Sequence, residues 1–246
     1  MVIDFHNHLG IDLGAELSQT ADELIARMDE AAIALAVIFP FPGCPDLAAG
    51  NATVWDAAAR YSDRLIPFLG VNPREHRNQS ADELTAYLNE RAAHGIIIDP
   101  MMHHFSLRHA IVDPLMQACA TLHLSVMIQL IGQGQEDCSP MVELAARHPE
   151  VTVIVSPLVY CPGWATIAKA QPNLYADTAK PMRPGHIVQL VNALGAERVL
   201  FGSETPYMSP LVEREKFRYT DLSEETQEQI LSGNAERLLS VVKDAA

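Results

Sequence analysis

Two histidines near the start of the chain have the type and spacing that metal binding uses. The segment Asp4-Phe5-His6-Asn7-His8 ends an apolar, β-branched run. Because side chains alternate along a strand, we expect Asp4, His6 and His8 to share one face and Phe5 to point toward covering helices. Two imidazoles on one face can clamp an ion through nitrogen. The alternative is a pair of hydrogen-bonded histidines, because a catalytic ion usually has three protein ligands.

Two carboxylates follow later apolar runs at positions that suit catalysis. Glu204 comes two residues after Gly202, the glycine that ends one run. Asp99 follows three isoleucines, so a carboxylate buried there needs a partner. We predict Glu204 as a metal ligand or general base, and Asp99 as a second acid–base or metal-binding group. The alternatives are an ion-paired loop residue for Glu204 and a helix cap or turn residue for Asp99.

Other polar residues are placed where they could contact a substrate. The loop after Asp99 holds His103, His104 and Arg108, and the guanidinium of Arg108 could pair with a substrate carboxylate. The alternative for each of them is a solvated loop residue. Three more polar residues end later runs and are also predicted to bind substrate: Gln129, Ser156 and Asp177.

All these residues lie at or after the ends of apolar runs that alternate with helical patterns. Thr20 with Glu23, and Ser80 with Glu83, form capping boxes, and prolines 114 and 184 suit the first turns of helices. The runs are eight in number and span Val2–His8, Leu35–Phe39, Arg64–Gly70, Gly95–Asp99, Leu124–Leu130, Val151–Val155, Asn173–Asp177 and Arg198–Gly202.

Eight β–α units in a chain of this length predict a closed (β/α)8 barrel, the TIM barrel, as a single domain over residues 1–246. In such barrels the chemistry lies at the carboxyl ends of the strands, which is where the polar residues above are found. The alternative fold is an open, doubly wound sheet. It is disfavoured because the first run is not followed by a glycine-rich phosphate loop.

Composition excludes several classes of partner. The 246 residues carry 17 Lys and Arg against 31 Asp and Glu, a net charge of −14, so we expect neither nucleic acid nor an anionic membrane as a partner. No apolar run approaches the roughly 20 residues of a membrane helix, and no signal-peptide pattern is seen. Widely separated cysteines predict reduced thiols in a cytoplasmic protein. They are Cys44, Cys119, Cys138 and Cys161.

Ordered motifs over nearly the whole chain resemble those of the amidohydrolase superfamily, specifically its amidohydrolase-related group of small barrel hydrolases and decarboxylases. IDFHNH at 3–8 resembles the family's D-x-H-x-H, and GIIIDP at 95–100 is similar to its G-x-K-L-H-P. PNLYADT at 172–178, RVLFGSETP at 198–206 and NAERL at 234–238 are similar to further family motifs. The resemblance implies a (β/α)8 barrel with a divalent metal ion, usually zinc, at its mouth.

The family's ligand set is only partly present. The resemblance implies His6 and His8 as ligands, with Glu204 in place of an aspartate. Gln129 and Ser156 stand where the family has histidines, and an isoleucine replaces its bridging lysine. Two histidines and one carboxylate still suffice for catalytic zinc, so we expect one divalent ion, zinc or alternatively manganese. The other alternative is a site that has lost its metal.

These observations predict an enzyme that hydrolyses a small cyclic amide, ester or lactone through a metal-activated water, or decarboxylates a small acid. The expected substrate is a polar or acidic small molecule, and the resemblance implies a homodimer. Two alternatives remain open. One is a metal-free lactonase or isomerase, and the other is a non-catalytic, ligand-binding barrel.

Overall fold

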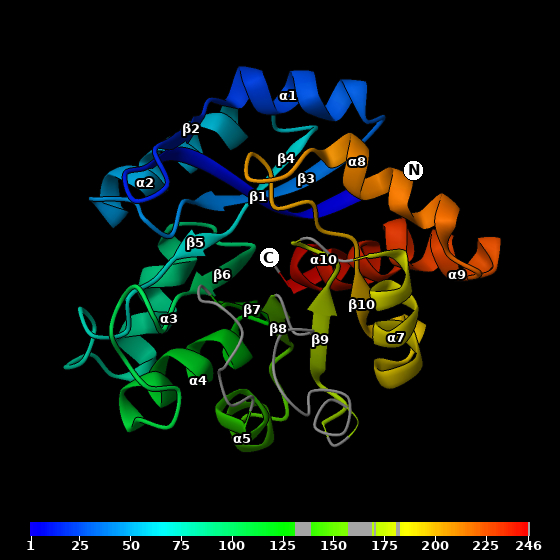
Figure 1. The fold of residues 1–246 in the computed structure, drawn as a ribbon. Helices are drawn as coiled ribbons and strands as arrows, with labels where there is room; N and C mark the ends of the chain where they lie inside the picture. Colours follow the sequence, from blue (N-terminus) through cyan, green and yellow to red (C-terminus); the bar gives the residue numbers. More distant parts are fainter. Residues whose placement is uncertain (131–138, 157–168, 170, 181–182, 246) are drawn as a thin grey trace.

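Parallel strands form a closed barrel that helices surround, as Figure 1 shows for this computed structural model. The structure describes residues 1–130, 139–156, 169, 171–180 and 183–245, so Cys138 and Cys161 lie outside the described residues. Each of the eight predicted runs contributes to a strand, which confirms the TIM barrel. The strands are β1 (Ile3–Asp12), β2 (Leu17–Gln19), β3 (Leu35–Pro40), β4 (Leu65–Pro67), β5 (Leu69–Gly70), β6 (Gly95–Ile98), β7 (Ser125–Gln129), β8 (Val153–Ser156), β9 (Leu174–Asp177) and β10 (Val199–Leu200).

The third predicted run forms two short strands, and each of them pairs with a different neighbouring strand. It was predicted to be continuous over Arg64–Gly70, but it breaks at Phe68 into β4, which pairs with β3, and β5, which pairs with β6. The backbone N–H of Phe68 donates to the carbonyl of Ile38 over 2.9 Å. The barrel therefore consists of one sheet in the order β2-β1-β3-β4 and a second in the order β10-β9-β8-β7-β6-β5.

Hydrogen bonds between the first strand and the segment after β10 complete the ring. Phe5 N donates to Phe201 O over 2.8 Å, and His8 N donates to Thr205 O over 3.0 Å. Beyond His8, β1 continues to Asp12 and pairs antiparallel with β2, a hairpin that the sequence did not predict. This closure brings the end of the chain's last strand directly beside the two histidines.

The helices begin where local signals place them. Thr20 and Ser80 both form complete capping boxes, with Glu23 and Glu83, at the starts of α1 and α3. The helices are α1 (Ala21–Glu30), α2 (Leu47–Arg60), α3 (Ala81–Glu90), α4 (Asp113–Thr121), α5 (Ser139–Arg147), α7 (Pro184–Leu194), α8 (Pro210–Glu215), α9 (Glu224–Glu228) and α10 (Asn234–Ala245), with 3-10 turns η1 (Ala110–Val112), η3 (Ala196–Arg198) and η4 (Lys216–Tyr219) and a π turn η5 (Gln229–Gly233).

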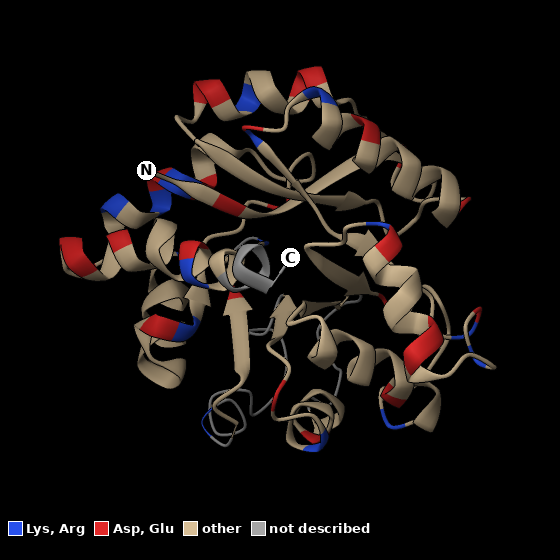
Figure 2. Ribbon diagram, turned by 180° about the vertical axis from the view of Figure 1, so that it is seen from behind, with Lys and Arg blue, Asp and Glu red and all other residues tan. Residues whose placement is uncertain are grey.

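The buried apolar residues form two cores, one between the strands and the helices and one inside the barrel. The larger core lies between strands and helices, and a smaller inner core takes residues from the facing strands, joined by Ala235 and Leu239 of α10. Figure 2 shows that Lys, Arg, Asp and Glu residues lie mostly in the surrounding helices and loops, and that few lie in the strands. Within the described ranges, every helix is too short or too polar to cross a membrane.

Candidate metal centre

A β-bulge in β1 sets the direction of the first-strand side chains. The pairing of β1 with β3 changes register between Asp4 and Asn7, so one extra residue lies in β1 at that point. The side-chain amide of Asn7 donates to the carbonyls of Asp4 and Val37, each over 3.0 Å. These two bonds satisfy carbonyl groups at the irregular part of the ladder and hold the bulge in place.

The prediction that Asp4 shares a face with His6 and His8, with Phe5 opposite, is wrong. Phe5 lies in the inner core of the barrel. The carboxylate of Asp4 instead accepts the backbone N–H groups of His6, over 3.2 Å, and Ser203, over 2.9 Å. The bulge is the physical reason, because one extra residue reverses the alternation of side chains beyond it.

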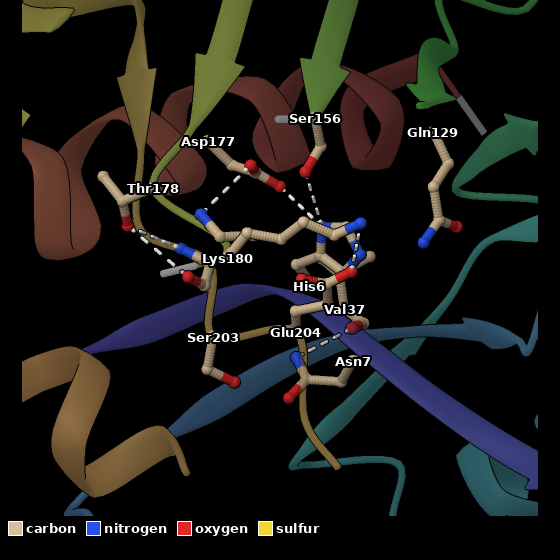
Figure 3. A network of polar contacts seen from close by, with 12 residues as sticks. His6, Asn7, Val37, Gln129, Ser156, Asp177, Thr178, Lys180, Ser203 and Glu204 are labelled. Carbon is tan, nitrogen blue, oxygen red and sulfur yellow. Dashed lines mark hydrogen bonds and ion pairs between the residues drawn. The ribbon is translucent and has the colours of Figure 1, made fainter. Parts of the chain in front are cut away.

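The two imidazoles face each other with their Nε2 atoms 3.2 Å apart. On the far side of the His6 ring, Nδ1 donates to Asp177 Oδ2 over 2.7 Å, and the Ser156 hydroxyl lies 3.1 Å from the same nitrogen (Figure 3). His8 Nδ1 lies 3.3 Å from the carbonyl of Pro40. Because a carboxylate and a carbonyl only accept, each Nδ1 carries the proton and each Nε2 presents a lone pair to the shared space.

Glu204 enters the same space from the segment after β10. Its backbone N–H donates to the carbonyl of His6 over 2.9 Å, and its φ of 59° lies in the left-handed region. That backbone conformation is unfavourable for a residue with a side chain, and such residues concentrate at functional sites. One ligand atom from each of His6, His8 and Glu204 lies within 4.8 Å of the others.

Gly202 allows this segment to pack directly against the first strand. A Cβ atom at position 202 would lie 2.9 Å from the Cβ of His6 and 3.1 Å from Asp177 Oδ2. Any side chain there would push apart the histidine, its carboxylate partner and the loop that carries Glu204. The glycine of the motif at 198–206 therefore has a steric role in bringing the three strand ends together.

Burial and neighbouring charges shift the pKa values of His6, His8 and Glu204 in different directions. Burial alone would lower the pKa of His6, but the charge and the hydrogen bond of Asp177 outweigh it, so this pKa is raised. Burial lowers the pKa of His8 well below its usual range, and the charge of His6 adds to the shift. Burial raises the pKa of Glu204, opposed by the charges of His6 and Lys180. A cation among these groups would compensate the buried carboxylate.

The donor set fits a divalent cation. Two imidazole nitrogens and one carboxylate are a ligand set of catalytic zinc sites. Among the described residues, Glu204 Oε2 is buried and has no hydrogen-bond partner. Asp177 holds His6 through Nδ1, an arrangement that orients metal-binding histidines. The amide of Gln129 lies 3.3 Å from His8 Nε2, and an amide can present its oxygen from the same position as a weaker fourth donor.

The loop after β6 arranges its polar residues differently. Asp99 accepts the backbone N–H groups of Met101 and Met102, each over 3.0 Å, which is the contact of a turn residue. His103 is half-buried and lines a small cavity together with Asp99 and Gln129, and burial lowers its pKa. His104 is exposed. The proposed catalytic and substrate-binding roles of these residues stay predictions.

Arg108 is engaged with an outer helix. Its guanidinium donates to the two carboxylate oxygens of Glu143 over 2.6 and 2.9 Å and to the Ser139 hydroxyl over 2.5 Å, both on α5. Nearly half of its side chain is exposed. The acidic helix partner therefore holds the donors that were predicted to meet a substrate carboxylate.

A cavity of 370 Å³ opens beside the cluster and reveals residues that the sequence analysis missed. Glu204 and Gln129 line it, together with Lys180, Tyr207 and Asp12. The Tyr207 ring stands edge-on to the His8 ring, and its hydroxyl donates to Asp12. Lys180 and Tyr207 each lie three residues beyond a predicted site residue, so reading further past each strand end would have found them.

Comparisons with known proteins identify the family and the fold of the chain. The family model described as amidohydrolase matches residues 3–241. Among solved structures, a 2,6-dihydroxybenzoate decarboxylase in complex with 2,6-dihydroxybenzoate has a TM-score of 0.78 at 14% identity, over 98% of each chain. A dihydroxybenzoic acid decarboxylase from Polaromonas sp. JS666, with bound manganese and 2-nitroresorcinol, has a TM-score of 0.74 at 14% identity, over 98% of this chain and 97% of the other.

A third solved structure broadens the range of chemistry found on this fold. The 4-oxalomesaconate hydratase from Rhodopseudomonas palustris has a TM-score of 0.73 at 19% identity, over 100% of this chain and 97% of that one. No curated protein sequence matches the chain. At these identities the solved structures establish the fold, while the family match over residues 3–241 establishes the relationship. The resemblance seen in the motifs is thereby confirmed, and the chain belongs to the amidohydrolase family of barrel enzymes.

Proposed function

We propose that the protein is a metal-dependent enzyme that hydrolyses a small cyclic amide, ester or lactone, or decarboxylates a small acid, with one divalent ion held by His6, His8 and Glu204. The observation that carries the proposal is the convergence of these three side chains within 4.8 Å. The decarboxylases and the hydratase that share the fold are named for small acids, which supports a small-molecule substrate here.

Zinc is the proposed ion, and manganese is the alternative. Two imidazoles and a carboxylate suit zinc, whereas an amide oxygen from Gln129 and the manganese bound to the Polaromonas decarboxylase support manganese. When bound, the ion would act as a Lewis acid toward a carbonyl or carboxylate oxygen of the substrate.

The chain's own residues would prepare the site in four ways. Asp177 keeps the His6 proton on Nδ1, so that Nε2 remains a free donor of electrons. Glu204 has two carboxylate oxygens, so one could bind the ion while the other, Oε2, exchanges a proton with the reacting group. Tyr207 packs edge-on against His8 and would help to hold that ring in position. Asp99 and His103 are proposed to contact the substrate through the small cavity they share with Gln129.

Metal analysis of protein purified without a tag or chelator is the first test. We expect about one equivalent of zinc or manganese, lost in His6→Ala and His8→Ala variants. Screening lactones and cyclic amides for proton release, and small acids for carbon dioxide release, then separates hydrolysis from decarboxylation. A protein that takes up less than about a tenth of an equivalent after incubation with either ion would reject the metal mechanism.

One contact favours a metal-free enzyme as the second candidate. The ammonium of Lys180 lies 3.4 Å from Glu204 Oε1 and already supplies a positive charge beside the carboxylate. In that case the histidine and carboxylate groups would act as acid and base without an ion. Activity without bound metal, abolished by His6→Ala, would support this candidate against the first.

The remaining expectations extend the proposal to the whole chain. The family match over residues 3–241 supports one domain, and the free thiols of Cys44 and Cys119 support a reducing, cytoplasmic setting. A homodimer is expected by analogy with the family. Light scattering on a sizing column measures the molar mass, and a value near the 27.0 kDa of one chain would contradict the dimer.

A further inference from the structure

Lys180 lies at the carboxyl end of β9, three residues beyond the carboxylate that holds His6. Its backbone adopts a φ of 72°, in the left-handed region that few residues with side chains occupy. Only 25% of its side chain is exposed, and Nζ lies 3.4 Å from Glu204 Oε1. Its aliphatic stem crosses the site toward His6 and Glu204 (Figure 3). The backbone and the ion pair together aim the ammonium into the barrel mouth.

The cavity beside the cluster combines this ammonium with apolar walls. Among the described residues that line it, Lys180 is the one lysine or arginine. Its other polar lining residues are Glu204, Gln129, Asp12 and Tyr207. The apolar lining residues include Met102, Met208, Pro42 and Ala15. Such a cavity suits a ligand with an apolar body and a single polar head group.

We propose that Lys180 selects the substrate by its charge, and that its ammonium binds the carboxylate of a small acid with an apolar body. The inference rests on the proposed function, because a cation held by His6, His8 and Glu204 would take over the neutralisation of Glu204. An ammonium has three N–H donors and no acceptor, and Glu204 Oε1 engages at most one of them. Within the described part of the chain, Glu204 is the one ion-pair partner of Lys180, so its other donors can meet an anion in the cavity.

Charge balance at the mouth supports the same assignment. Of the other carboxylates at the mouth, Asp177 accepts a hydrogen bond from His6 over 2.7 Å, and Asp12, which also lines the cavity, accepts one from the Tyr207 hydroxyl. A divalent cation with one carboxylate ligand leaves a net positive charge, and Lys180 adds to it. In a low-dielectric cavity this field favours an anionic ligand over its neutral isostere. Arg108, bound to Glu143, is the residue that the sequence had suggested for this task.

The alternative role for Lys180 is that it only neutralises the charge of Glu204, and this role leads to a different expected result. A lysine that only neutralises Glu204 acts mainly on stability and metal affinity, and its loss lowers carboxylate affinity much less than loss of a direct contact does. Carboxylate–amide pairs of the same shape separate the two roles, because they differ mainly in charge. Benzoate with benzamide, and crotonate with crotonamide, are suitable probes for a cavity of 370 Å³.

The experiment measures the binding of both pairs by calorimetry to zinc-loaded protein and to its variants. We expect the wild type to prefer each carboxylate over its amide, and Lys180→Met to lose at least about tenfold in carboxylate affinity while amide affinity stays the same. Lys180→Arg should keep the preference, since it keeps the charge. Lys169→Met, at an exposed position, is the matched control and should behave as the wild type.

Several results would overturn the inference. Equal affinity of the wild type for carboxylates and amides would do so, as would an unchanged preference in Lys180→Met or no detectable carboxylate binding. Metal content, measured on the same samples, tests the proposed function separately. A chain that takes up no zinc but keeps a Lys180-dependent preference would defeat the metal proposal and leave the role of Lys180 standing.

Discussion

Two regions of this molecule are rich in residues that could do chemistry, and only one of them gathers those residues into a buried cluster. At the strand ends, His6, His8 and Glu204 converge although about 200 positions separate the first from the last. In the loop after β6, His104 is exposed and Arg108 is paired with a helix, although both lie close together in sequence.

The difference comes from what fixes each backbone. Parallel strands of a closed barrel must all end at one mouth, so residues at their ends are brought together by the ladder itself. A loop residue has no such constraint, and its side chain pairs with whatever partner lies nearest. Proximity along the chain is therefore a weaker guide to a shared site than equivalent positions on successive strands.

Removing a first-strand imidazole should give the largest difference in metal affinity between the strand-end cluster and the loop after β6. His8→Ala deletes one of three donors, so we expect metal affinity to fall by at least about 100-fold, measured by competition with a chelator. The matched control in the other region is His104→Ala, which should bind metal as the wild type does. Equal loss in both variants would show that the loop belongs to the site.

Asp177→Asn tests how strongly the site depends on the partner of His6. An amide can donate to His6 Nδ1, which would move the ring proton to Nε2, where it would block a cation. We expect metal affinity or activity to fall about 10- to 100-fold with little change in thermal stability. Metal titration followed by calorimetry measures the effect, and wild-type affinity in this variant would remove Asp177 from the site.

Glu213 is a buried carboxylate in α8, outside the strand-end cluster, and no chemical role is proposed for it. Burial raises its pKa to about 7, opposed by Lys216, with the charges of Asp4 and Glu204 adding smaller contributions to the rise. Because the folded-state pKa lies above the unfolded one, stability is full below about pH 4.5 and declines as the pH rises toward 7. The decline should amount to at most about 3 kcal/mol.

The Glu213→Gln variant should flatten this part of the stability profile, which urea unfolding at a series of pH values measures. Metal affinity should not follow the same profile, since Glu213 lies outside the cluster. An unchanged slope in the variant would assign the pH dependence to other carboxylates, with Asp4 first among them because burial raises its pKa to about 6.

Arg108→Gln gives the smallest expected effect. It breaks a half-exposed ion pair with Glu143, which should cost less than about 1 kcal/mol in unfolding experiments. Binding of benzoate should be unchanged, in contrast to Lys180→Met. A tenfold weaker affinity for benzoate in Arg108→Gln would return the substrate carboxylate to the loop, as the sequence first suggested.

The helix starts that were predicted correctly rest on contacts between residues near in sequence. The capping boxes of α1 and α3 each involve residues three apart, and both formed as expected. The split of the third run at Phe68 could not be predicted, because it depends on which neighbouring strand each half must reach. The bulge at Asn7 was hidden for the same reason, since it exists only relative to β3.

The sequence by itself was enough to predict that strands and helices would alternate and that they would close into a barrel. It also indicated the two first-strand histidines and Glu204 as candidate metal ligands. Only the tertiary structure decided that Asp4 turns away from the histidines, that Arg108 pairs with α5, and that Lys180 reaches the mouth. Apolar periodicity is a local property, so it can be read from the sequence alone. The direction of a polar side chain is set by partners far along the chain, which exist only after the barrel has closed.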